Sequence, residues 1–172
     1  MTITRFILQQ AIAGGIINAV LNGPIGLLLV QGDTKWPLWG LPSLSFDTCA
    51  MAFGIAWGTG WILTPQLRKQ IASGKVVVPK MPQQLREDFH KWPLSGMQRG
   101  LNLGGFALLL FALPAVLGMM VFGVEGWGRE QITVFKTVFG FVVGSVFTPV
   151  TALAVAAEVP VAGFEAVAPS EG

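Results

Sequence analysis

"FILQQAIAGGIINAVLNGPIGLLLV", residues 6–30, contains no charged side chain. The hydrocarbon core of a bilayer needs about 20 apolar residues of helix, so this run is long enough to span a membrane. Three further apolar stretches meet the same requirement, at roughly residues 46–64, 100–122 and 132–157. The sequence therefore predicts an all-α membrane protein with four transmembrane helices.

The composition of the whole chain agrees with a membrane protein. Hydrophobic residues make up 52% of the chain and charged residues 12%, whereas an ordinary soluble domain is about 25% charged. The mean hydropathy is +0.63. A chain of 172 residues has room for one compact helical domain, residues 1–172, and not for an additional soluble enzyme domain.

Residue types that carry chemistry are sparse. One cysteine, Cys49, and one histidine, His90, exclude an intramolecular disulfide and any metal or haem site built from several of either residue. The "GTG" at 58–60 lacks the third glycine of a dinucleotide-binding fingerprint, and no nucleophile has a recognisable base partner. We predict that the protein is not an enzyme and uses no cofactor or metal.

The basic residues are concentrated on one side of the predicted bundle. Loops 31–45 and 123–131 hold one cation each, Lys35 and Arg129. The remaining loop and the N-terminus hold the others: Arg5, Arg68, Lys69, Lys75, Lys80, Arg86, Lys91 and Arg99. Because Lys and Arg in short loops stay in the cytoplasm, both termini and loop 65–99 are predicted to be cytoplasmic. With a net charge of only +2, this pattern indicates membrane topology and not nucleic-acid binding.

The basic loop contains an amphipathic segment, "PQQLREDFHKW" at 82–92. Leu85, Phe89 and Trp92 recur at helical spacing, and charged residues surround the other side. Two interpretations are open. The segment lies along the inner membrane surface, or it is a connector helix that packs its apolar stripe on the bundle.

The second half of the chain resembles the first. "FGIAWG" at 53–58 matches "FGFVVG" at 139–144 at a shift of 86. A shift of 90 aligns Gly14, Gly15 and Pro24 with Gly104, Gly105 and Pro114, and a shift of 84 aligns Thr64-Pro65 with Thr148-Pro149. We predict two parallel two-helix repeats, related by an axis along the membrane normal.

Glycine pairs at a spacing of four suggest how the helices pack. In lipid, helices associate through close backbone approach at small residues. Three pairs meet this rule: Gly54 with Gly58, Gly100 with Gly104, and Gly140 with Gly144. The contacts they predict are either within the chain or between copies of it.

Polar residues interrupt the first apolar run. Asn18 and Asn22 fall on one side of that helix, and Pro24 leaves the carbonyl of an earlier residue without its usual partner, as Pro114 does in the third helix. Paired proline interruptions point to binding sites in transporters. Asparagine also forms hydrogen bonds between packed helices in membranes. These four residues therefore form either a polar lining or a packing contact.

Asp47 and Lys136 are the charged residues within or at the edge of apolar spans. Both lie toward the outer ends of their helices, and each falls roughly on the glycine face of its own helix. If those faces meet, the two charges form an intramembrane ion pair. In the alternative both reach the outer headgroups, since Asp47 also suits a helix N-terminus.

Helix two ends in "TPQLRKQ" and has an acidic residue at its outer start in "LSFDTCA", while helix four carries the equivalent "TPVTALA" without the basic pair. These features resemble small, uncharacterised four-helix proteins of the bacterial inner membrane, some of which are labelled permeases. The resemblance implies a location and no activity. Two functions remain: a small permease- or channel-like protein, acting as one chain or as a homo-oligomer, or an accessory subunit of a larger membrane complex.

Overall fold

The computed structural model describes residues 2–30, 34–93 and 95–159. Helix α1 is Ile3–Leu29. A continuous helical stretch follows, made of α2 (Leu44–Gly58), the π-helical segment η1 (Thr59–Leu63) and α3 (Thr64–Ala72). After α4 (Gln83–His90), the next continuous stretch consists of α5 (Gly96–Ala107), η2 (Leu108–Ala112) and α6 (Leu113–Val121), and the last helix is α7 (Arg129–Ala157).

Three helical stretches are long and apolar enough to cross a membrane: Ile3–Leu29, Gly96–Val121 and Arg129–Ala157. The fold is therefore that of a helical, multi-pass membrane protein. The span expected at 46–64 forms the middle of the stretch from Leu44 to Ala72. That stretch is as long as the others but less apolar, so it is not among the three found in the described residues.

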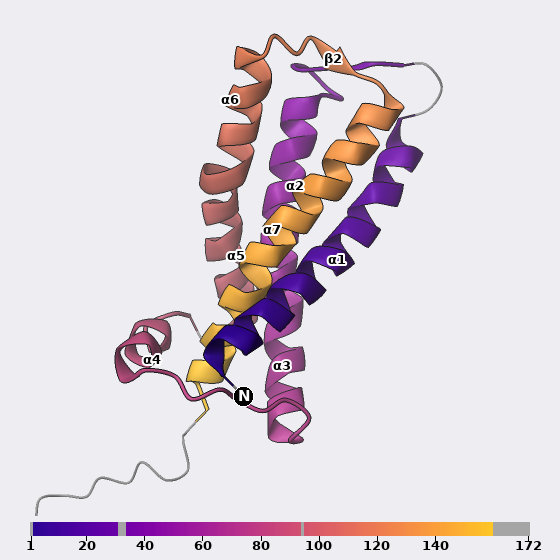
Figure 1. Ribbon diagram of the computed structural model, residues 1–172. Helices are drawn as coiled ribbons and strands as arrows, with labels where there is room; N and C mark the ends of the chain where they lie inside the picture. The colour runs from indigo at the N-terminus through magenta and orange to yellow at the C-terminus, as the bar shows by residue number, and fades with distance from the viewer. Residues whose placement is uncertain (1, 31–33, 94, 160–172) are drawn as a thin grey trace, which may run out of the picture.

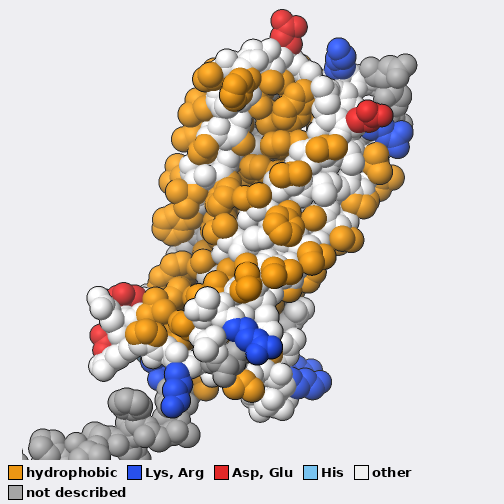
Figure 2. Space-filling model, viewed as in Figure 1, with side chains coloured by type: hydrophobic (Ala, Val, Ile, Leu, Met, Phe, Trp, Pro, Cys, Tyr) orange, Lys and Arg blue, Asp and Glu red, His pale blue; other side chains and the backbone are white. Residues whose placement is uncertain are grey.

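Helix α7 runs through the middle of the bundle (Figure 1). Helix α1 packs along one side of it, and α2 packs on α7 and on α5. The N-terminus, α3, α4 and the last turn of α7 lie at one end, which we call the basic end (Figure 1). The C-terminal turns of α7, Thr151–Ala157, are buried there. In the space-filling view apolar side chains cover the middle of the bundle, and most Lys and Arg side chains in view lie at this end (Figure 2).

The opposite end carries a short antiparallel ribbon that we had expected to be loop. Strand β1 (Trp36–Pro37) pairs with β2 (Gly126–Trp127), so that Trp36 stands opposite Trp127. Strands of two residues are too short to show an alternation pattern, so the ribbon could not be predicted from the sequence. The ribbon fastens the loop after α1 to the loop before α7.

Helices α1 and α7 approach each other so closely that their backbones touch. A Cβ atom on Gly144 would lie 2.5 Å from the carbonyl oxygen of Gly14, and a Cβ on Gly140 would lie 3.0 Å from that of Asn18. A Cβ on Gly23 would lie 2.6 Å from Thr137 Oγ1. Glycine is required along this seam because any side chain would push the helices apart.

The second close seam joins α5 to α2 and η1. A Cβ on Gly60 would lie 2.5 Å from the Cα of Gly100, and Gly104 faces the ring of Phe53. Gly54 and Gly58 make no such contact within the chain, because a Cβ on either would meet nothing within 4 Å, so contact between copies is the alternative that remains for this pair. The contact face runs along residues 53, 57, 60 and 64, and a residue next to that face points about 100° away from it.

The two π-helical segments each end two residues before a proline. Segment η1 precedes Pro65 and η2 precedes Pro114, whereas Pro24 and Pro149 lie inside regular α-helix. A proline cannot donate to the carbonyl four residues earlier, and a π turn is one way in which the helix accommodates that loss. The two interruptions expected to correspond, at Pro24 and Pro114, therefore differ in structure.

Helix α4 packs on the bundle. Phe89 contributes to an apolar cluster with Phe6, Leu67 and Leu153, and Trp92 packs against the main core. Of the two interpretations of segment 82–92, the structure has the connector helix that lays its apolar stripe on the other helices. No residue of the helix itself is fully buried.

We predict that Gly144→Ala destabilises the bundle by about 1–3 kcal/mol, as expected for overpacking. The added methyl group would meet the backbone of α1, which cannot move without opening the seam. The matched control is Gly105→Ala, where a Cβ meets nothing within 4 Å. Unfolding of both variants by titration with denaturing detergent checks this. Equal stability of the two variants would contradict the packing described.

Candidate functional site

An ion pair joins α2 to α7 near the ribbon end of the bundle. The ammonium of Lys136 donates to both carboxylate oxygens of Asp47, at 2.6 and 2.7 Å. The side chain of Lys136 is 3% exposed and that of Asp47 is 16% exposed. The structure thus brings together the two charged residues that the sequence placed within apolar spans.

The route by which the charges meet differs from the one we expected. We predicted contact between the Gly54–Gly58 and Gly140–Gly144 faces, but the first pair is open and the second packs on α1. Lys136 instead runs beside α1, where a Cβ on Gly26 would lie 3.3 Å from its Cδ. The small residue on α1 leaves room for the lysine stem to reach α2.

Asp47 is held in place by the start of its helix. It lies in the first turn of α2, whose N-terminal residue Ser43 accepts from the amide of Phe46 at 3.3 Å. The unpaired amides at a helix N-terminus favour a carboxylate in the first turn. Asp47 therefore has two stabilising neighbours, the Lys136 ammonium and the helix N-terminus.

A pocket of about 430 Å³ opens beside this carboxylate. We call it the outer pocket; it is lined by Leu29, Trp36, Leu41, Pro42, Ser43, Phe46 and Asp47. Its wall is mainly apolar and aromatic, and Asp47 supplies its charged group. Lys136 reaches Asp47 from the other side and is not part of the lining.

The two amides expected to line a polar path lie in the α1–α7 seam. Asn18 donates to the carbonyl of Gly14 and Asn22 donates to that of Asn18, each at 2.8 Å. The side chains also contact α7, since a Cβ on Gly144 would lie 2.6 Å from the Asn18 amide nitrogen. Both amides donate within α1 itself, so they lie in the packing contact with α7 but do not make the hydrogen bond between helices that we expected.

Pro24 and Pro114 do not complete a lining with these amides. Both prolines are exposed on the outside of the bundle, and α1 and α6 lie on opposite sides of α7 (Figure 1). The structure therefore does not assemble the expected polar lining of Asn18, Asn22, Pro24 and Pro114. A regular helical pattern assigns residues to a face, but it does not say which neighbour covers that face.

A second charged site lies at the basic end, where α7 stops. Glu158 accepts from Arg68 Nε at 2.7 Å and from an Arg99 terminal nitrogen at 2.6 Å. Arg99 is 0% exposed and also donates to Thr64 Oγ1 at 3.3 Å and to the carbonyl of Pro93 at 3.0 Å. These contacts, which we call the inner charge cluster, hold α3, α5 and α7 together.

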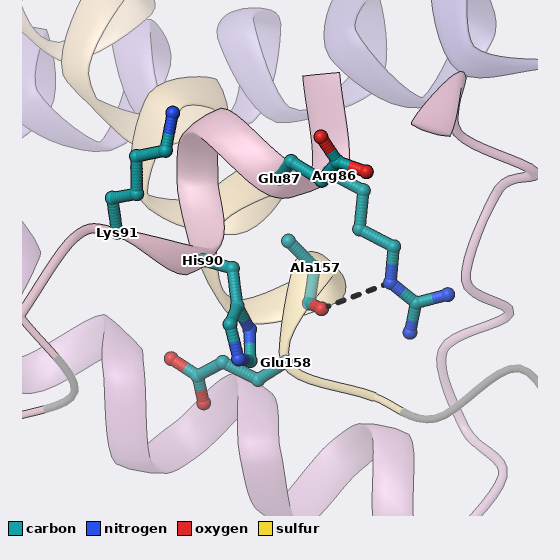
Figure 3. A pocket seen from close by; sticks show the side chains of 6 residues that line it. All are labelled: Arg86, Glu87, His90, Lys91, Ala157 and Glu158. Atoms are coloured by element: carbon teal, nitrogen blue, oxygen red, sulfur yellow. Dashed lines mark hydrogen bonds between the residues drawn. The ribbon is translucent and has the colours of Figure 1, made fainter. Parts of the chain in front are cut away.

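A pocket of about 570 Å³ borders the inner charge cluster. Figure 3 shows its lining: Arg86, Glu87, His90, Lys91, Ala157 and Glu158. The side chain of Arg86 crosses from α4 to the end of α7, where it donates to the carbonyls of Ala157, at 3.3 Å, and Val159. It thereby satisfies carbonyls that a helix C-terminus leaves free.

Two opposing effects act on the pKa of Glu158. Burial raises it, but the hydrogen bonds and positive charges of Arg68 and Arg99 outweigh burial and hold it below the ordinary value of 4.5. From the sequence we interpreted Arg99 only as a topology signal and did not predict this site. The available signal was a carboxylate directly after an apolar span, at the end where the cations gather.

Within residues 2–30, 34–93 and 95–159, no three His, Cys, Asp or Glu side chains gather into a metal-binding group. Both charged sites consist of ion pairs between a carboxylate and a basic side chain, and such pairs can open or exchange partners.

We predict that Asp47→Ala and Lys136→Ala each destabilise the fold by about 3–5 kcal/mol, because each leaves a buried charge without its partner. The exchange of Asp47→Lys with Lys136→Asp should restore part of the loss. Restoration is partial because a lysine in the first turn of α2 opposes the helix dipole. Denaturing-detergent titrations of the wild type, the two alanine variants, their double variant and the exchange measure the coupling and the restoration. Simple addition of the two single effects would show that the pair contributes nothing.

The lowered pKa of Glu158 predicts a pH-dependent stability. The ionised form is favoured in the fold, so its contribution is present above pH 4.5 and is lost as the pH falls below 4.5 through the lowered folded-state pKa. Thermal unfolding of wild type and Glu158→Gln between pH 7 and pH 3 tests this. The wild type should lose its advantage over the variant at the acidic end, and a constant difference across the range would refute the expectation.

Comparisons with protein-family models, with curated proteins and with solved structures found no match. The two charged sites and the helices that carry them are therefore the features from which a function can be inferred.

Proposed function

We propose that the protein is a small permease- or channel-like protein with four transmembrane helices, located in the inner membrane of a bacterium. The observation that carries the proposal is the Asp47–Lys136 pair, which lies between helices in apolar surroundings. Charged side chains in membrane helices are costly to insert, and they mark substrate and ion pathways. The proposal involves no enzymatic step and no cofactor.

The stretch Leu44–Ala72 is tied to α7 by an ion pair near each of its ends. Asp47 binds Lys136 near one end, and Arg68 binds Glu158 near the other. Lys136 and Glu158 are separated by about 33 Å of helical rise, close to the thickness of about 30 Å of a bilayer core. Segment η1 lies between the two pairs, and π turns are frequent at functional sites. These two ion pairs could open separately, one at each face of the membrane, which supports a gated path.

The fourth transmembrane helix in this proposal is the stretch Leu44–Ala72, which runs alongside the other long helices (Figure 1). In two parallel repeats, helix one corresponds to helix three and helix two to helix four. A contact between helices one and four should therefore have a counterpart between helices three and two. The closest seams are those of α1 with α7 and of α5 with α2 and η1. This correspondence supports the repeat. We place both termini in the cytoplasm on the cation distribution.

Topology can be tested with a reporter that is active only in the periplasm. We expect activity when it is fused after residue 38 or 127, and none when it is fused after residue 80 or 172. The reason is that the seven cations of loop 65–99 keep that loop inside. Activity at residue 80 would reverse the proposed orientation.

A second candidate function, an accessory subunit of a larger membrane complex, has an observation of its own. Gly54 and Gly58 form a small-residue face on α2 with nothing within 4 Å of a Cβ on either. Such a face allows close approach of another helix. In an accessory subunit, or in a homo-oligomer, a helix of the partner would cover this face of α2. The larger side chain of Gly54→Leu would then release the partner.

Reconstitution separates the two functions. We expect the purified chain to behave as a defined species in mild detergent and, in proteoliposomes, to give currents on solid-supported membranes when a cation gradient is applied. Asp47→Asn should reduce them at least tenfold, while Asp88→Asn, an exposed carboxylate of α4, should not.

Silent proteoliposomes would contradict the permease. Co-purification with a heterologous protein that Gly54→Leu abolishes would then establish the accessory subunit.

A further inference from the structure

We propose that the outer pocket binds an organic ammonium ion with an apolar body, whose cationic head takes the place of the Lys136 ammonium on Asp47. The inference gives the proposed permease a substrate class. It rests on that function for transport, whereas binding can be tested by itself.

The lining of the outer pocket fits such a ligand. Trp36 and Phe46 offer aromatic surfaces, which attract cations as well as apolar groups. Leu29, Leu41 and Pro42 add apolar wall. A pocket of about 430 Å³ lies within the range of about 300–1,000 Å³ usual for small-molecule sites.

The charge of the pocket selects a cation over an anion. Its charged lining residue is a carboxylate, and the Lys136 ammonium contacts that carboxylate from within the bundle. An anionic ligand would meet Asp47 first and be repelled. The N-terminus of α2 keeps the carboxylate stabilised when Lys136 moves away.

Competition with Lys136 follows from the geometry. The lysine donates to both oxygens of Asp47, so an arriving cation must displace it or share the carboxylate. Sharing would place two positive charges next to one negative charge in apolar surroundings, which favours displacement. Because the lysine stem is flexible, its head can withdraw without movement of the helices. Removing the lysine charge should therefore tighten ligand binding.

The test uses isothermal titration of the full chain in a neutral detergent, with phenethylammonium as the probe, whose N–H groups can donate to Asp47 as Lys136 does, and benzenesulfonate as the anionic counterpart. We expect the cation and not the anion to bind. Asp47→Asn should weaken binding at least tenfold, and Lys136→Met should tighten it at least tenfold. Equal binding of both probes, or no tightening in Lys136→Met, would overturn the proposal.

A matched pair of variants keeps the test valid if changes in the ion pair impair folding. Phe46 lines the pocket and is 61% exposed, whereas Phe122 is 86% exposed and is not part of the lining. Phe46→Ala should weaken binding of the cation at least threefold and Phe122→Ala should leave it unchanged. An equal effect of the two substitutions would place the ligand elsewhere.

An ammonium head is also present in phosphatidylethanolamine, so a separate experiment must distinguish a lipid ligand from a soluble amine. Nanodiscs that contain phosphatidylethanolamine should compete with the probe if the lipid is the occupant, and nanodiscs of phosphatidylglycerol alone should not. Absence of competition assigns the pocket to a soluble amine. Probe binding without any current in proteoliposomes would support the site and contradict the permease. Currents without probe binding would support the permease and contradict the proposed binding site.

Discussion

The contact between the backbones of α1 and α7 is the constraint on which the rest of the structure depends. Lipid gives two apolar helices no hydrophobic reason to associate, so the seam relies on close approach at Gly14, Gly140 and Gly144. That approach presses Asn18 onto α7 and explains why its amide is satisfied within its own helix. At Gly26 the seam leaves space for the stem of Lys136 to pass α1 and reach the carboxylate on α2.

Helix α7 connects the two charged sites because it is packed on several sides. Its last turns are buried at the basic end, which fixes the point where the chain leaves the helix and brings Glu158 between Arg68 and Arg99. A buried arginine such as Arg99 requires a carboxylate and several acceptors, and the cluster supplies them from three elements. The same helix carries Lys136 toward the other end.

Hydropathy and cation counts predicted the long apolar helices and the end at which the cations gather, because both depend on composition along a segment. Residue-level contacts were harder. The depth of Asp47 and Lys136 in their spans made an ion pair one of two open alternatives, and the contact between glycine faces that was expected to bring them together is absent from the chain. Gly54 and Gly58 satisfy the same spacing rule as Gly140 and Gly144, yet the contact face of α2 lies beside them. The Arg99–Glu158 contact joins residues far apart in sequence and has no periodic pattern, so only the fold reveals it.

The way in which the helices are held suggests which part of the molecule can move. The α1–α7 seam is a backbone contact without space to slide, and it forms a rigid pair. The stretch from Leu44 to Ala72 packs on α5 by a similar backbone contact at Gly60 and Gly100, whereas its two ends are fastened to α7 by ion pairs at Asp47 and Arg68, which can exchange partners or open to water. Segment η1 lies between those two points, where an irregular helical turn bends more readily than a regular one. A cation that displaces Lys136 from Asp47 would release the outer end of this stretch while Glu158 still holds the inner end. Binding at one face would thereby be coupled to movement of the outer end of this stretch, while its middle stays packed on α5.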